Sequence, residues 1–196
     1  RITMNTKYTI ITNRPGRPFV GAIGRRALLA GLAVTAPLAL AACGDDANAA
    51  GIEDGVLTVD LVDFSFGDLP DSVPAGTRLE VTNESKGELH ELVAIRLPDD
   101  EQRSATELVE SALPDLLAGG PPVAVLLAAP GGEQIPAVGD GTLSEPGRYL
   151  ILCAIPTGVD PGEYLAAAAA SNGEPPQVAG GAPHFAHGMF DELVVE

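Results

Sequence analysis

Histidine, methionine and cysteine are rare in this chain of 196 residues, and three of these residues lie close together near its end. The segment PHFAHGM, residues 183–189, holds two of the three histidines and one of the two methionines. The third histidine is His90, and the only cysteine besides Cys43 is Cys153. Imidazoles, a thiolate and a thioether are donors for soft and borderline transition metals. These residue types therefore predict a metal site assembled from distant parts of the chain.

Two imidazoles and one thiolate with a distant methionine sulfur form the ligand set of a blue copper site, which exchanges one electron between Cu(I) and Cu(II). Each residue also has an ordinary interpretation. A lone cysteine and a methionine often fill a core, and a histidine can lie in a core or a solvated loop. The sequence leaves open whether His184 or His187 binds a metal. Glu91, beside His90, is a further candidate oxygen ligand.

Charge is divided sharply along the chain. Six of the eleven basic residues precede Cys43 and no acidic residue does, whereas after it five basic residues stand against 27 acidic ones, a net charge of −22. This excess of negative charge excludes nucleic acid as a partner. We expect a partner protein with a basic surface.

The basic segment ends in an apolar leader, GRRALLAGLAVTAPLALAAC, residues 24–43. Its 16 uncharged residues, 27–42, are fewer than the roughly 20 that a membrane helix needs, and the layout is that of a secretory signal. LAAC, residues 40–43, resembles a bacterial lipobox, which implies a lipid on Cys43. We predict a lipoprotein signal peptide over 1–42 and an extracytoplasmic protein, anchored to the membrane on its outer face or periplasmic side. Sec or twin-arginine export, and cleavage without lipid, stay open.

Residues 43–55 are small and acidic and predict a flexible tether. A folded domain is expected over 56–196. Runs of alternating apolar residues at 56–66, 77–83, 89–97, 147–155 and 190–196, separated by glycine and proline, predict an all-β antiparallel sandwich. The alternation breaks after Leu61, which suggests a bulge or a crossing between sheets.

Two segments interrupt the strands. Ser104 and Glu107 form a capping-box motif that predicts one short helix, bent or ended at Pro114. Thirty residues separate Cys153 from His184, and about 157–182 of them are expected to form a surface insertion. The alanine run within it favours one or two helical turns.

Three motifs suggest a family. The turn segment VTNESKGELHEL, residues 81–92, leads to His90; GRYLILC, residues 147–153, has the form G-x-Y-x-x-x-C; and HFAHGMFDELVV, residues 184–195, has the form H-x-x-x-x-M before a last strand. From about residue 56 onward the chain resembles the cupredoxin family, the plastocyanin-like type 1 blue copper proteins. The resemblance implies a Greek-key β-sandwich that binds copper, Cu(I) or Cu(II), through His90, Cys153, His184 and Met189, with His187 as a substitute for His184.

The resemblance also implies a function. It predicts an extracytoplasmic electron-transfer protein, not an enzyme, that exchanges electrons with a redox partner protein. Plastocyanin-like proteins have only a few residues between the cysteine and the second histidine, where this chain has 30. Two alternatives therefore stay open. One is a copper chaperone or storage lipoprotein, and the other is a metal-free cupredoxin-like interaction domain.

Overall fold

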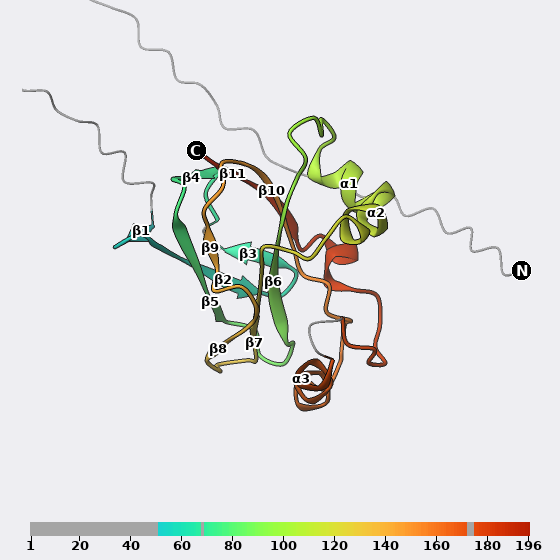
Figure 1. The fold of residues 1–196 in the computed structure, drawn as a ribbon. Coiled ribbons are helices and arrows are strands. Elements are labelled where there is room, and N and C mark those ends of the chain that lie inside the picture. The colour runs from blue at the N-terminus through green and yellow to red at the C-terminus, as the bar shows by residue number, and fades with distance from the viewer. Residues whose placement is uncertain (1–50, 68, 172–174) are drawn as a thin grey trace, which may run out of the picture. The chain divides into compact units, whose positions relative to one another are not determined.

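Two β-sheets pack face to face in the computed structural model, which describes residues 51–67, 69–171 and 175–196 (Figure 1). The predicted signal peptide, 1–42, and the predicted lipidation site, Cys43, lie outside the described residues. Short helices lie outside the two sheets. The predicted all-β sandwich is thus confirmed. Among the described residues, no helix combines the length and the apolar character needed to cross a membrane.

The first sheet contains the strand that opens the domain. Its order is β1-β2-β5-β9, and β3 pairs with the end of β2 at Asp60–Val62, whereas β1 pairs with the start of β2 at Val56 and Leu57. Leu57, Val59 and Leu61 alternate into the core from β2, as the sequence pattern predicts. The strands are β1 (Ile52–Glu53), β2 (Val56–Val62), β3 (Ser65–Gly67), β5 (Thr77–Asn83) and β9 (Thr142–Leu143).

The second sheet is larger and carries the strands that hold the metal-ligand candidates. Its order is β4-β11-β10-β6-β7-β8, so β6 and β10 lie side by side at its centre. Its strands are β4 (Ser72–Val73), β6 (His90–Arg96), β7 (Ala124–Ala128), β8 (Gln134–Val138), β10 (Gly147–Leu152) and β11 (Phe190–Val195).

Most strand pairs are antiparallel, as predicted, and two are parallel. β2 pairs with β5 in parallel, and β4 pairs with β11 in parallel. Between β2 and β5 the chain crosses to the second sheet, where it forms β4. It then crosses back, and β5 runs parallel to β2. Parallel neighbours need a crossover connection of this kind, whereas antiparallel neighbours can be joined by a short hairpin.

The second sheet is covered on both faces. One face joins the first sheet in the main core, which includes Cys153 and Met189. The other face packs against α1 (Ala105–Ser111) and α2 (Leu113–Ala118) through Leu108, Leu113 and Leu150. Burial on both faces explains why β6 is buried along almost its whole length, instead of alternating.

The predicted helix is present and is broken just before Pro114, where the sequence predicted a bend or an end, but the structure contains further helices beyond the single one expected. The capping box is present, since Ser104 accepts a hydrogen bond from the backbone N–H of Glu107, but α1 ends at Ser111. Pro114 lies in the first turn of a second helix, α2, where a missing N–H costs nothing. A third helix, α3 (Pro161–Ala170), contains the alanine run and is capped by Asp160. It is longer than the one or two turns expected, and Tyr164 anchors it to the core.

Two boundaries also differ from the expectations. β1 lies within the predicted tether, 43–55, and pairs with β2, so ordered pairing begins before residue 56. After β2 the chain makes a tight hairpin into β3 in place of a bulge or a crossing. Phe64 adopts a φ of 62° in this turn, which reverses the strand. The broken alternation therefore marks a change of strand.

The insertion leaves and rejoins the domain through a closed stem. Pro156 and Pro183 form an isolated bridge, and the backbone N–H of Thr157 donates to the carbonyl of Ala182 at 3.1 Å. A Cβ on Gly180 would lie only 2.5 Å from the Cβ of Pro156, so the close approach requires glycine here. The stem lets 30 residues separate Cys153 from His184 while the two stay adjacent.

Candidate metal centre

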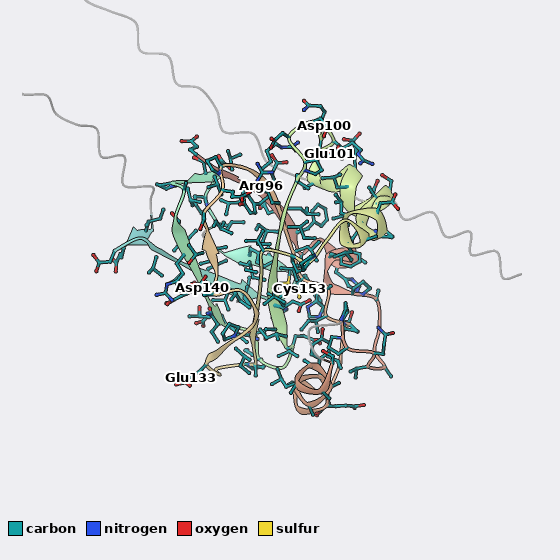
Figure 2. All side chains as sticks on the ribbon, viewed as in Figure 1. Arg96, Asp100, Glu101, Glu133, Asp140 and Cys153 are labelled. Carbon is teal, nitrogen blue, oxygen red and sulfur yellow. The ribbon has the colours of Figure 1, made fainter. Side chains whose placement is uncertain are left out.

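Three predicted ligands meet at one point in the core. His90 begins β6, Cys153 directly follows β10, and His184 begins the 3₁₀ helix η1 (His184–His187). All three side chains are fully buried, and Figure 2 shows Cys153 within the body of the domain. Together they form a group able to hold a metal ion.

The distances among the donor atoms fit a metal. The Cys153 Sγ lies 3.3 Å from His184 Nδ1 and 4.0 Å from His90 Nδ1, and the two Nδ1 atoms are 3.0 Å apart. The circle through these three atoms has a radius of about 2.0 Å and its centre lies inside the triangle. Transition-metal bonds to nitrogen and sulfur are about 2.0–2.3 Å long. An ion at the centre would therefore reach all three donors without movement of the backbone.

The β6–β10 ladder places the thiol beside the first histidine. Leu152 pairs with Val93, so the residue after β10 emerges next to the start of β6. The backbone N–H of Glu91 donates to the Cys153 Sγ at 3.4 Å. A donor N–H aimed at sulfur stabilises the thiolate and fixes its direction.

The turn after the insertion brings the second histidine and the methionine back to the cysteine. The N–H of Phe185 donates to the Cys153 carbonyl at 2.8 Å, and the N–H of Cys153 donates to the Met189 carbonyl at 3.1 Å. Gly188, with a φ of 102°, ends η1 and lets the chain reverse into β11. Met189 is fully buried in the same core cluster as Cys153.

His187 lies outside the group of donors. Its side chain is exposed, its ring stacks at a tilt on Phe64, and its Nε2 lies 3.3 Å from the Thr157 Oγ1. Of the two histidines in this segment, the structure therefore places His184, and not His187, in the group of donors.

The Glu91 side chain is buried and accepts a hydrogen bond from the backbone. Its Oε1 accepts a hydrogen bond from the N–H of Ala154 at 3.1 Å, which joins β6 to the segment after Cys153. Burial raises the pKa of the Glu91 carboxyl to about 7, and the hydrogen bond from Ala154 opposes that rise. Glu91 is not part of the donor group formed by His90, Cys153 and His184.

Burial keeps the two imidazoles neutral and the thiol protonated. Desolvation and the neighbouring His184 lower the pKa of His90 to about 4, although Asp63 opposes the shift. Desolvation also lowers the pKa of His184, against the opposing charge of Glu88. Burial raises the pKa of the Cys153 thiol well above its usual range. The imidazoles are therefore ready to donate at neutral pH, and a metal must displace the thiol proton.

Three residues that the sequence reasoning missed surround the donors. Asp63 and Glu88 approach the outer nitrogens of His90 and His184 at 3.8 and 3.4 Å. Asn83, at the end of β5, fixes the turn before His90: its Nδ2 donates to the carbonyls of Glu88 and Ala128, and its Oδ1 accepts from the N–H of Ser85. The one sequence signal was the position of Asn83 and Glu88 within the turn segment 81–92.

No protein-family model matches this chain, and no curated protein matches it. Among solved structures it is similar to reduced auracyanin from the photosynthetic bacterium Roseiflexus castenholzii, with 20% identity, 72% of this chain and 97% of that chain covered, and a TM-score of 0.41. It is also similar to auracyanin B, with 20% identity, coverage of 72% and 88%, and a TM-score of 0.35. Auracyanin A, a blue copper protein from Chloroflexus aurantiacus, gives 17% identity, coverage of 72% and 99%, and a TM-score of 0.36.

For this chain, the donor atoms and their spacing remain the observations that define the site. Two imidazoles and one thiolate in a buried trigonal arrangement fit copper, because this donor set and geometry suit both of the common oxidation states of copper.

Replacing Asn83 by alanine should destabilise the domain by about 2–3 kcal/mol, because three hydrogen bonds are lost and two of them, to the Ala128 carbonyl and from the Ser85 N–H, are buried. Denaturant unfolding of the copper-free protein measures this change. Lys86→Ala, an exposed change in the same turn, is the control and should stay within about 0.5 kcal/mol of the wild type. Equal stability of the two variants would contradict the role given to Asn83.

Proposed function

We propose that this protein is a copper-binding electron carrier with a type 1 site formed by His90, Cys153, His184 and Met189. The observation that supports it is the buried triangle of one sulfur and two nitrogens, whose centre is about 2.0 Å from each atom. Bound copper would supply a one-electron couple, since the thiolate favours Cu(I) and the imidazoles suit both states. Among the described residues, His90, Cys153 and His184 form the single group of side chains able to hold a metal ion. We therefore propose that the protein is an electron carrier and not an enzyme.

The protein fixes the positions of the donor atoms and excludes water from them. The Glu91 N–H fixes the sulfur, the Phe185 and Met189 backbone bonds fix the turn that carries His184, and all three ligand side chains are inaccessible to water. Ligands that keep one arrangement in both oxidation states need little rearrangement when an electron arrives or leaves. A preorganised environment of this kind is the main way in which proteins lower such barriers.

Met189 is the proposed weak axial ligand. It is fully buried, follows Gly188 directly, and is tied through its backbone to both Cys153 and His184. A long bond to a thioether tunes the potential of such a site without carrying most of the binding.

The proposed site of action is outside the cytoplasm, with the protein held at the membrane by a lipid on Cys43. Support comes from the leader, residues 24–43, and from the net charge of −22 after it, which suits a redox partner with a basic surface. The mass of the N-terminal peptide of protein extracted from membranes checks this. A free thiol on Cys43, or an intact leader, would contradict the anchor.

Storage or delivery of copper is the nearest alternative, and it would use the same three donors. Its sequence support included an extra ligand from His187, which the structure leaves outside the group. A metal-free interaction domain is the other alternative, and it rested on the long Cys153–His184 separation, which the stem of the insertion spans. Metal analysis of gently purified protein that finds no stoichiometric copper would favour that alternative.

Protein loaded with Cu(II) should show an intense thiolate-to-copper absorption band in the red, because the Cys153 sulfur lies in direct reach of the ion. Cys153→Ser should abolish the band, since the serine hydroxyl has no sulfur and cannot replace the thiolate donor. His187→Ala, which alters a histidine outside the group, should keep it. Absence of the band in the wild type, or its survival in Cys153→Ser, would remove the proposal.

Voltammetry of the copper-loaded protein should give a reversible one-electron couple, and Met189→Gln should lower its midpoint potential. A harder amide oxygen in the axial position favours Cu(II) over Cu(I). The red band should survive in this variant, because the sulfur and both imidazoles remain. A wild-type couple too slow to be reversible would favour storage, and an unchanged potential in Met189→Gln would exclude Met189 as a ligand.

A further inference from the structure

The two ligand imidazoles are oriented alike, with one nitrogen inward and the other toward a carboxylate. Their Nδ1 atoms face the Cys153 sulfur, whereas His184 Nε2 lies 3.4 Å from a Glu88 oxygen and His90 Nε2 lies 3.8 Å from an Asp63 oxygen. For Nδ1 to donate to a metal, the proton of a neutral ring must be on Nε2. Each outer nitrogen is buried and lacks an aligned hydrogen bond, so the carboxylate is the acceptor nearest to it.

Glu88 is placed more firmly than Asp63. The Glu88 side chain is 26% exposed, and the same Oε2 that approaches His184 also accepts a hydrogen bond from the N–H of Gly158 at 3.0 Å. Its backbone carbonyl is held by Asn83 and Ser85. Asp63 lies on the β2–β3 turn, is 61% exposed, and is farther from its imidazole. Water and salt screen an exposed charge much more than a partly buried one.

The partner of Glu88 belongs to the insertion. Gly158 is the second residue after the bridge at Pro156 and has a φ of 70°, which turns its N–H back toward the turn before His90. The long segment between Cys153 and His184 therefore contributes a contact at the metal centre, in addition to closing its own stem. This contact links Glu88, the carboxylate behind His184, to the segment that follows Cys153.

We propose that Glu88, held by Gly158 of the insertion, is a positioning residue that keeps the proton of His184 on Nε2 and favours the oxidised, more positively charged copper ion. The inference rests on the proposed function and adds the residue that sets the balance between the two copper states. A carboxylate behind a ligand imidazole fixes its tautomer and makes it a stronger donor, and loss of such a partner commonly costs 10- to 100-fold in metal affinity. Asp63 acts in the same direction at His90, to a smaller extent.

The test compares Glu88→Gln, Asp63→Asn and Asp100→Asn. Gln keeps the shape and the acceptor oxygen of Glu88 but removes its charge, and Asp100 is an exposed carboxylate that Figure 2 shows well away from Cys153. Chelator competition measures the affinities for Cu(I) and Cu(II) separately, voltammetry measures the potential, and ¹⁵N NMR of the copper-free protein reports the tautomer of His184.

Glu88→Gln should lower the affinity for Cu(II) about tenfold or more while changing that for Cu(I) less, and so raise the potential. Asp63→Asn should shift the potential less, and Asp100→Asn should leave it unchanged. A Glu88→Gln protein that keeps the red band but matches Asp100→Asn in potential and affinities would overturn the inference while the proposed function stands. If the wild type shows no band, the proposed function fails, and NMR decides alone: a His184 proton on Nδ1 would overturn the inference.

Discussion

Three donor atoms must stay within 4.0 Å of one another in a region that water does not reach, although the two histidines are 94 residues apart in the chain. A thiol and two imidazoles in such a place are costly to bury unless they are satisfied. The sulfur meets this constraint through a hydrogen bond from the Glu91 N–H, whereas each imidazole Nε2 faces a nearby carboxylate without an aligned hydrogen bond. The two central strands, β6 and β10, then fix the distance between the halves of the site.

The covering of the second sheet on both faces explains how the site can be rigid. Leu150 and Leu152 of β10 pack against α1 and α2, while Tyr149 and Ile151 face the first sheet. Close packing on both sides leaves the end of β10 no direction in which to relax. Cys153 therefore emerges from the sheet at a fixed point, and η1 docks on it through Phe185.

The three residues that the structure brings together could be picked out from the sequence because each lies in a local motif with a fixed spacing: His90 in the turn segment, Cys153 at the end of an apolar strand, and His184 before Met189. The spacing to Met189 already favoured His184 over His187, and the structure places His184 in the donor group and leaves the His187 side chain exposed outside it. Pro114 marked the break in the first helix, but a proline can also lie in the first turn of a helix, so the separate second helix was not predicted. Asp63 and Glu88 are two of 27 acidic residues, and only folding shows which of them meet an imidazole.

The stem between Pro156 and Pro183 also separates two tasks within one loop. Among the described residues, the hydrogen bonds that the start of the loop makes around the donors come from Ala154 and Gly158, whereas α3 lies beyond the closure and contacts the core through Tyr164. A chain built this way can change the length and content of the outer part while its inner edges keep their geometry. The region around α3 is thus a natural place to graft a docking helix, a fluorophore or an electrode linker onto the protein.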